Sequence, residues 1–228
     1  GLGIHFDDTS TAQTIGTVSL CIILFSGGMN TRIGEIKPIM KQGISLATVG
    51  VLLTSMITGF LIYWVLGATS ETAPIGLTTS LLMASTMSST DSASVFSILR
   101  SKGLHLKNNL RPMLELESGS NDPMAYVLVI TLIEICQIGG TPNYLEAIVF
   151  LILQLLIGGI AGYVIGKWSV KLINKLEIDN SSLYPILSLT LCVFIFSFTY
   201  YIKGNGYLAV YIGGLVFGNN SFVHKRSS

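Results

Sequence analysis

The sequence predicts an all-α fold, a polytopic transmembrane helical bundle with one broken helix. Half of the 228 residues are hydrophobic, only 11% are charged, and the mean hydropathy is +0.66. A soluble domain carries roughly 25% charged residues, so lipid is the expected surrounding medium. The net charge of +1 gives no excess of basic side chains for a nucleic acid, which we therefore do not expect as a partner.

Seven apolar stretches make up the chain, each about as long as the roughly 20 residues that a membrane-spanning helix needs. Turn residues and charges mark the boundaries between them. The predicted spans are 12–30, 40–67, 74–99, 110–135, 144–168, 183–202 and 205–220. Together they form one transmembrane domain over residues 1–228, and no soluble domain is expected. Because the first residue is Gly1 and not Met, we expect an internal piece of a longer protein.

Basic residues are concentrated in alternate loops between these spans. Twelve of the thirteen Lys and Arg side chains lie in the segments 31–41, 100–111 and 167–175 or near the C-terminal end, and Lys203 is the exception. Basic residues gather on the cytoplasmic side of a membrane, so these three loops and the C-terminal end are predicted to be cytoplasmic. The expected location is the cell (inner) membrane, with the chain entering from outside.

Glycines recur every four residues in two of the spans. Gly158, Gly162 and Gly166 lie in the fifth span, and Gly214 and Gly218 lie in the seventh. Small residues at this spacing let the backbones of two membrane helices approach closely. The pattern predicts helix packing at these positions and no further function.

Hydroxyl side chains crowd the third span around Asp91, where residues 84–94 read ASTMSSTDSAS. Such side chains compete for backbone hydrogen bonds and weaken a helix. We predict an interruption within Ser88–Ser92, with free carbonyl oxygens near Thr90 and a new helix start capped by Asp91 or Ser92. The alternative is an unbroken helix in which the hydroxyls bond to the preceding turn.

Two aspartates lie deep in the predicted spans. Asp91 is roughly 13 Å from the cytoplasmic end of the third span, and Asp122 is roughly 16 Å from that of the fourth. An ionised carboxylate at such depth costs at least a few kcal/mol in lipid, so it faces the protein interior or water and marks an ion or proton path. The alternative is a pair of buried carboxylates that only tie helices together.

The fourth span adds further polar groups next to Asp122, in the sequence ELESGSNDP over residues 115–123. Helical spacing places Glu117 and Asn121 on one face and Ser118 on the neighbouring face with Asp122. Pro123 has no N–H, so the carbonyl four residues before it is left free. Carboxylate, hydroxyl and carbonyl oxygens suit a hard monovalent cation, whereas a transition metal would favour His or Cys ligands. No cofactor is expected.

These stretches resemble the NhaP-like branch of the monovalent cation:proton antiporters, and within it most closely the potassium/proton antiporters linked to cell-volume regulation. The resemblance rests on STDSASVFS at 89–97, ESGSNDPMA at 117–125 and GNGYLAVY at 204–211. It implies a partial inverted-repeat antiporter fold and exchange of K⁺ or Na⁺ for protons, without enzymatic activity. It also implies that the full-length protein is a homodimer, whose later helices would lie beyond Ser228.

The resemblance assigns roles to particular residues. The implied cation- and proton-binding residues are Asp122, Asn121, Glu117, Ser118, Thr90 and Asp91. Asp122 would hold either ion, with Asn121 as its orienting partner. The monovalent cation would be bound by Asp122, Glu117, Ser118 and Thr90. Thr90 and Asp91 would form the unwound crossing segment.

Two other functions are compatible with mid-membrane aspartates. An intramembrane aspartyl protease would need Asp91 and Asp122 to share a proton. A resemblance to this class would require a Gly-x-Gly-Asp sequence at the second aspartate, whereas the chain reads Gly-Ser-Asn-Asp-Pro at 119–123. A passive cation channel would need a filter segment that lines the pore, and the sequence shows no repeated segment of this kind. It would also leave the proton-accepting Asp122 without a purpose. Both readings are weaker than the antiporter.

Overall fold

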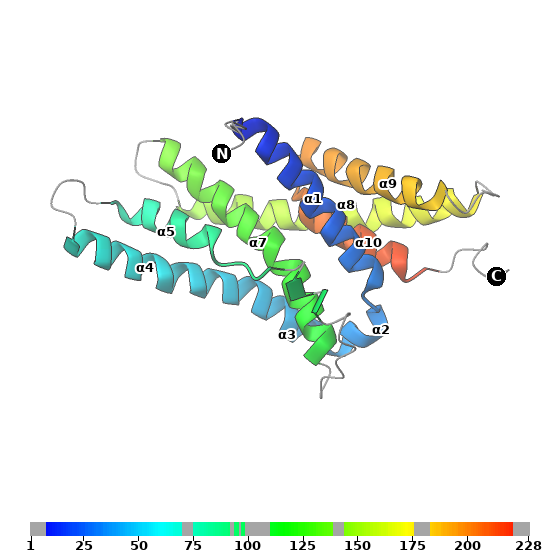
Figure 1. Cartoon of the computed structure of the whole chain (residues 1–228), viewed down its shortest axis with the longest axis horizontal. Helices are drawn as coiled ribbons and strands as arrows, with labels where there is room; N and C mark the ends of the chain where they lie inside the picture. Colours follow the sequence, from blue (N-terminus) through cyan, green and yellow to red (C-terminus); the bar gives the residue numbers. More distant parts are fainter. Residues whose placement is uncertain are drawn as a thin grey trace, which may run out of the picture.

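The residues that this computed structural model describes form helices and short connections, with no strand among them. The described residues are 8–69, 75–91, 94, 95, 97, 98, 110–138, 144–175 and 183–220. The longer helices are α1 (Thr9–Asn30), α4 (Val51–Thr69), α5 (Leu77–Thr86), α7 (Leu110–Ile138), α8 (Tyr144–Lys175), α9 (Leu183–Tyr201) and α10 (Gly206–Gly218). Figure 1 shows them as a bundle in which α1 and α7 run obliquely across the others. The predicted all-α class is confirmed.

Short helical pieces lead from α1 into α4. They are α2 (Ile33–Ile36), the 3₁₀-helix η1 (Lys37–Ile39), α3 (Met40–Ser45) and the π-helical turn η2 (Leu46–Gly50). The segment 31–41, predicted as a loop, therefore contains helical turns. Pro38 lies at the start of η1, where its missing N–H leaves no hydrogen bond unmade.

Helix α8 extends further than the sequence predicts. The segment 167–175 is predicted as a loop but is the helical end of α8. The physical reason is its amphipathic spacing, because Lys167, Lys171 and Lys175 are four residues apart and exposed, while Val170 and Ile173 between them are buried. Of the predicted loop 100–111, residues 100–109 lie outside the described residues, as does the predicted cytoplasmic end beyond residue 220.

Helix α10 packs between α1 and α8 and also contacts α9. On the α8 side, a methyl group added at Gly158 would lie 2.5 Å from the carbonyl oxygen of Asn205, and one at Gly162 would lie 2.7 Å from the Cα of Ala209. At Gly166 the nearest atom would be 3.1 Å away. The backbones of α8 and α10 therefore approach too closely for side chains, which confirms the packing predicted from these glycines.

The α1 side of α10 is built in the same way. A methyl group at Gly214 would overlap the carbonyl of Phe25, and one at Gly218 would overlap that of Met29. Both helices thus touch through backbone atoms. We call α1, α8, α9 and α10 the α10-centred group.

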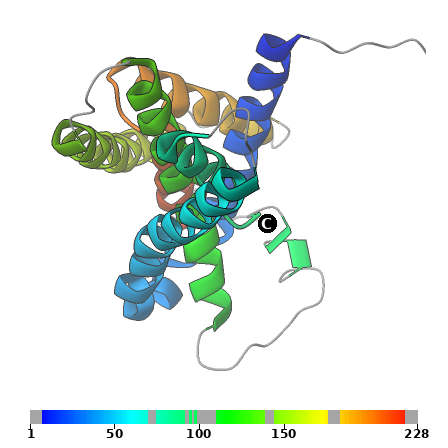
Figure 2. The same cartoon turned by 90° about the vertical axis from the view of Figure 1, so that its left-hand side faces the viewer.

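A second set of helices surrounds α7. Helix α5 contacts both α4 and α7, and α3 and η2 pack against the first half of α7. Figures 1 and 2 show α4 and α5 running side by side. Gly59 of α4 lies close to Leu81 of α5, where an added methyl group would be 3.1 Å from the Leu81 Cα. We call α3, η2, α4, α5 and α7 the α7-centred group.

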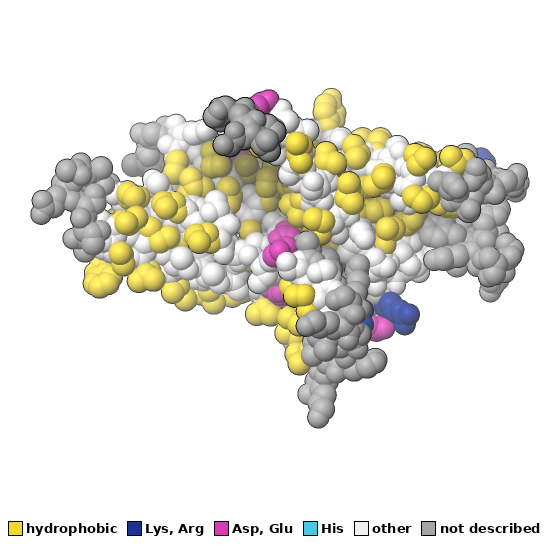
Figure 3. Space-filling model, in the orientation of Figure 1, with side chains coloured by type: hydrophobic (Ala, Val, Ile, Leu, Met, Phe, Trp, Pro, Cys, Tyr) yellow, Lys and Arg dark blue, Asp and Glu magenta, His cyan; other side chains and the backbone are white. Residues whose placement is uncertain are grey.

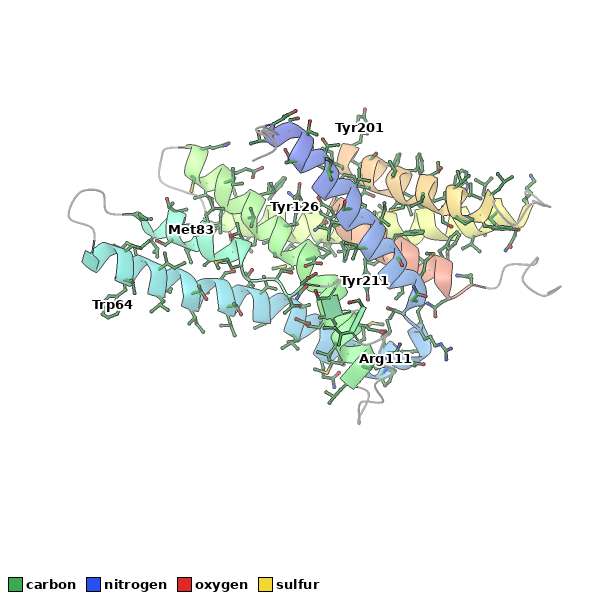
Figure 4. All side chains as sticks on the ribbon, viewed as in Figure 1. Trp64, Met83, Arg111, Tyr126, Tyr201 and Tyr211 are labelled. Atoms are coloured by element: carbon green, nitrogen blue, oxygen red, sulfur yellow. The ribbon has the colours of Figure 1, made fainter. Side chains whose placement is uncertain are left out.

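Large apolar side chains cover the outside of the bundle. Ile57 and Trp64 of α4 are each 68% exposed, and Leu145 of α8 is 71% exposed. Figure 3 shows hydrophobic side chains over much of one face, and in Figure 4 Trp64 points away from the bundle. A surface of this kind is suited to lipid and not to water.

Several helices are long enough to cross a bilayer. Within the described part of the chain, the stretches that are both long and apolar enough are Thr9–Asn30, Ile33–Gly67, Leu145–Lys175 and Leu183–Tyr201. Helix α10 is apolar but has 13 residues, and the 29-residue α7 carries carboxylates. The count of seven spans stays a prediction.

Candidate functional site

The third predicted span is interrupted where its hydroxyl groups are densest. Helix α5 ends at Thr86, and the backbone from Met87 to Asp91 is not helical. Ser88 closes the last turn, with its N–H and its hydroxyl both donating to the Ser85 carbonyl, at 3.3 and 2.7 Å. The predicted break within Ser88–Ser92 is confirmed for residues 88–91, since Ser92 lies outside the described residues.

Asp91 begins the helical turn that follows the break. Its carboxylate accepts hydrogen bonds from the Ser94 N–H at 3.3 Å and the Ser94 hydroxyl at 2.5 Å. The Val95 N–H donates to the Asp91 carbonyl at 3.0 Å. These bonds are those of a helix N-cap, as the sequence predicts for Asp91 or Ser92. The Asp91 side chain is exposed.

Asn121 of α7 connects the non-helical segment after α5 to the carboxylate of Glu117 in α7. Its side-chain amide donates to the Thr90 hydroxyl at 2.6 Å and to Glu117 Oε1 at 3.1 Å. The Thr90 and Ser118 hydroxyl oxygens are 3.4 Å apart. Asn121 and Ser118 are almost fully buried, at 1% and 0% exposure. One buried amide therefore holds together groups from α7 and from the interruption of α5.

Asp122 is bonded to the same stretch. The Ser89 hydroxyl donates to Asp122 Oδ1 and also lies 3.2 Å from Asn121 Oδ1. Asp122 and Ser89 are half-buried, whereas Thr90 is exposed. Figure 3 shows acidic side chains gathered near the centre of the face that contains the end of α5. The cluster thus has a buried floor of Ser118 and Asn121 and an accessible side at Thr90.

The structure brings most of the predicted site residues together. Hydrogen bonds or short contacts, in part through Ser89, link Thr90 of the non-helical segment after α5 with residues of α7, which are Glu117, Ser118, Asn121 and Asp122. The bonds described for the Asp91 carboxylate lead instead to Ser94. Asp91 therefore shapes the chain next to this cluster.

Sequence reasoning missed two residues at this site. The first is Ser89, which bonds to Asp122. It belongs to the run of hydroxyl residues at 84–94, but the sequence does not indicate which of these hydroxyls faces α7. Asn205 donates from its side chain to the Pro123 carbonyl at 2.8 Å. It lies in the stretch 204–211, to which no role was assigned.

The Tyr211 ring of α10 packs against α7 at Gly119, next to Ser118. Gly119 has no Cβ, and the space there is taken by the Tyr211 ring. The Tyr211 hydroxyl donates to the Glu115 carbonyl at 3.5 Å, while the Glu115 carboxylate accepts from Arg111 Nε at 3.2 Å. Figure 4 labels Tyr211 near the middle of the molecule, and α10 contacts both α1 and α7.

The ligand atoms gathered here are carboxylate and hydroxyl oxygens. Within the described residues, no group of three or more His, Cys, Asp and Glu side chains is placed to hold a metal ion. Hard cations prefer oxygen ligands, and an interrupted membrane helix is a recurring place for them. These oxygen atoms therefore suit a monovalent cation, or a proton on a carboxylate.

Known proteins match this chain along nearly its whole length. The family model described as sodium/hydrogen exchanger, transmembrane, matches residues 1–227. The K(+)/H(+) antiporter NhaP of Alkalimonas amylolytica is 38% identical over 217 residues, which are 95% of this chain and 36% of that protein. The K(+)/H(+) antiporter NhaP2 of Shewanella oneidensis is 37% identical over 218 residues, with the same coverage of 95% and 36%. The chain thus spans little more than a third of the length of these relatives.

A solved structure has the same fold. The sodium proton antiporter MjNhaP1 from Methanocaldococcus jannaschii, determined at pH 8, matches with a TM-score of 0.73 over 91% of this chain and 49% of that chain. The identity is 23%, so this likeness concerns the fold alone. The resemblance found in the sequence motifs is confirmed by the family model and by the two relatives. This multi-pass membrane protein belongs to the sodium/hydrogen exchanger family.

Proposed function

We propose that this chain forms the ion-binding part of a secondary active antiporter, which exchanges K⁺ or Na⁺ for protons across the cytoplasmic membrane. The observation that carries the proposal is that Asp122 and Asn121 bond to the hydroxyl groups of the non-helical segment that follows α5. Relatives named as K(+)/H(+) antiporters support it. In this proposal the protein is a transporter and not an enzyme.

Asp122 is the carboxylate at which the two ions compete. A proton neutralises it covalently, and a monovalent cation neutralises it by charge, so it holds one or the other. A bare carboxylate in a membrane interior is costly, and the loaded forms are therefore the ones that pass between the two faces. Competition at Asp122 gives exchange without a separate coupling device.

The other ligands complete the shell of oxygen atoms around the cation. Glu117, Ser118 and Thr90 supply carboxylate and hydroxyl oxygens within the same hydrogen-bonded cluster. The side-chain amide of Asn121 donates hydrogen bonds to Thr90 and Glu117. These two bonds hold both groups in place beside Asp122. Asp91 contributes by capping the turn after the break.

The decisive variant is Asp122→Asn in the complete protein. Asparagine has nearly the same shape but accepts no proton at working pH, so cation-dependent proton movement in vesicles should be abolished while folded yield is kept. Glu134→Gln, which removes an exposed carboxylate from the same helix, is the matched control and should exchange normally. If Asp122→Asn exchanges at the wild-type rate, Glu117 or Asp91 becomes the leading candidate.

The same vesicles separate the antiporter from the two other functions. An antiporter builds a pH gradient when a cation gradient is imposed. A passive channel would let the cation through without moving protons, and peptide cleavage by the purified protein would identify a protease. Either result would contradict the proposal.

We also propose an orientation and an assembly state. The segments 31–41, 100–111 and 167–175 and the C-terminal end face the cytoplasm, and the full-length protein is a homodimer in the cell membrane. Single cysteines at Lys37, Lys107 and Lys171 should then resist labelling from outside intact cells. Ready labelling of any one of them would show that the topology is wrong by at least one span.

A further inference from the structure

Asn205 lies in the turn between α9 and α10, where it is only 1% exposed. The turn is tight: Lys203 has a positive φ of 62°, and Gly204 has no room for a side chain beside Ile157 and Thr199. The Gly204 N–H donates to the Thr199 carbonyl at 2.9 Å. This geometry fixes the position from which the Asn205 side chain extends.

Three hydrogen bonds of Asn205 lead to three helices. Its backbone N–H donates to the Gln154 carbonyl of α8 at 2.9 Å. Its side-chain oxygen accepts from the Leu208 N–H at 3.0 Å and thereby caps α10. Its side-chain amide donates to the Pro123 carbonyl of α7 at 2.8 Å. A single buried residue therefore ties α7 to both α8 and α10.

The bonded carbonyl belongs to the residue next to Asp122. Pro123 has no N–H, so α7 lacks one of its own hydrogen bonds at this turn and is held less firmly by itself. A tie from outside the helix then has more influence on where the turn lies. The carbonyl oxygen of Asn205 packs against Gly158 of α8, where an added methyl group would lie only 2.5 Å from it. This close backbone contact with α8 holds Asn205 in place.

We propose that Asn205 is a positioning residue for the ion site, because its amide holds the Pro123 carbonyl and thereby sets the place of Asp122 relative to the α10-centred group. The inference rests on the proposed function of Asp122. Asn205 touches neither ion. It acts through the backbone of α7. Loss of its amide leaves every proposed ligand in the chain but shifts the position of Asp122.

The two side-chain atoms of Asn205 can be tested separately. Asn205→Ser keeps an oxygen that caps α10, since serine is as good an N-cap as asparagine, but it has no amide to reach Pro123. Asn219 provides a matched control at the other end of α10. Its amide donates to the Thr31 carbonyl at 2.7 Å and its oxygen accepts from the Ile33 N–H at 2.8 Å, so Asn219→Ser removes a similar tie that does not lead to α7.

The experiment measures cation binding by two routes in the complete protein. The first is the KM for K⁺ or Na⁺ and the maximal rate of cation-dependent proton movement in vesicles. The second is the rate at which a hydrophobic carbodiimide modifies Asp122, read by peptide mass spectrometry in detergent. The modification needs no transport and reports the surroundings of that carboxylate.

The loss of one hydrogen bond should change these readouts by roughly 3- to 10-fold. We expect Asn205→Ser to raise KM by this factor with a maximal rate near that of wild type, and to change the Asp122 modification rate, while Asn219→Ser alters neither. Equal effects of the two variants, or a lower maximal rate with unchanged KM and modification rate, would overturn the proposal. Asn205→Thr, which also caps a helix without an amide, replaces Asn205→Ser if the latter does not fold.

The modification rate keeps this inference separate from the proposed function. If wild-type vesicles exchange no cation for proton, the proposed function fails. A changed modification rate in Asn205→Ser alone would then still support the positioning of Asp122 by Asn205, and unchanged rates would overturn it.

Discussion

The two groups of helices in this protein are held together by opposite means. In the α10-centred group, α10 meets α1 and α8 through backbone atoms, and glycines at the contacts leave no room for side chains. In the α7-centred group, α5 stops at Thr86, and the non-helical segment that follows it joins α7 through hydroxyl, amide and carboxylate groups. One group is apolar and regular, and the other is polar and interrupted.

The difference teaches how a membrane fold can combine rigidity with an ion site. A helix that only packs keeps its internal hydrogen bonds and gains from close approach. A helix beside the candidate site gives up some of those bonds, so that polar atoms are left to meet a ligand. The α10-centred group should therefore be sensitive to added volume, and the α7-centred group to the loss of polar atoms.

The largest effect on stability is expected from Gly162→Ala in α8. The new methyl group would lie 2.7 Å from the Cα of Ala209, and backbone cannot move aside cheaply, so the free energy of unfolding should fall by about 1–3 kcal/mol. Gly16→Ala in α1 is the control, because nothing lies within 4 Å of that position. It should be neutral or stabilise by about 0.5–1 kcal/mol.

Denaturant unfolding in mild detergent measures both glycine variants. If Gly162→Ala is as stable as Gly16→Ala, the backbone contact between α8 and α10 is not what holds the α10-centred group together. The contrast between the two groups would then be lost.

The next effect is expected from Asn121→Ala in α7. The variant removes two amide bonds, to Thr90 and to Glu117, so the cation ligands lose their alignment. We expect KM for the cation to rise by roughly 10- to 150-fold, since a hydrogen bond to a charged group is worth about 1.5–3 kcal/mol. Asn220→Ala, which removes a local bond to Val216 at the end of α10, should leave KM unchanged, and a similar rise in both variants would contradict the role of Asn121.

A smaller effect is expected from Ser89→Ala. The hydroxyl that bonds Asp122 is lost, but Ser89 is half-buried, so water can take its place. KM should rise roughly threefold, the equivalent of a modest hydrogen bond. Thr86→Ala is a suitable control, because that exposed hydroxyl bonds only within α5 in the described contacts, to the Met83 carbonyl. A vesicle assay that finds equal KM values for the two variants would remove Ser89 from the site.

Much of this organisation is visible in the sequence because it depends on local patterns. The hydroxyl run predicts the break near Thr90, since the competing groups are neighbours in the chain. Glu117 and Asn121 are four residues apart on a helix, so their contact follows from helical geometry. Gly158 and Gly162 predict close packing for the same reason.

The parts that could not be predicted depend on tertiary contacts. Nothing local distinguishes Ser89 from Thr90 as the partner of Asp122, because the choice depends on how the non-helical segment 87–91 lies against α7. The bond between Asn205 and Pro123 joins residues 82 positions apart. The extension of α8 to Lys175 is not predicted, because three lysines near the end of an apolar span are as typical of a loop as of an exposed helix face, and helix ends are the least certain feature of a sequence prediction.

The smallest effect on stability is expected from Asp8→Ala at the exposed start of α1. This end of the α10-centred group is held by hydrogen bonds to a side chain and not by glycine packing. The Asp8 carboxylate accepts hydrogen bonds from the Thr11 hydroxyl at 2.5 Å and from the N–H groups of Thr11 and Ser10 at 3.2 and 3.0 Å. These bonds, that of the Thr11 hydroxyl foremost, hold the pKa of Asp8 below its ordinary value. The ionised carboxylate is therefore the form that caps the helix.

This cap should depend on pH in a defined direction. The pKa of Asp8 is lower in the folded than in the unfolded chain, so its stabilisation is complete above the unfolded value of about 4 and is lost as pH falls through the folded pKa. At neutral pH, Asp8→Ala should speed amide hydrogen exchange at Ser10 and Thr11, after correction for the intrinsic rate. The difference from wild type should vanish below the folded pKa. A difference that persists unchanged into strong acid would mean that Asp8 holds α1 by packing, as the glycines do elsewhere in this group, and not by its charge.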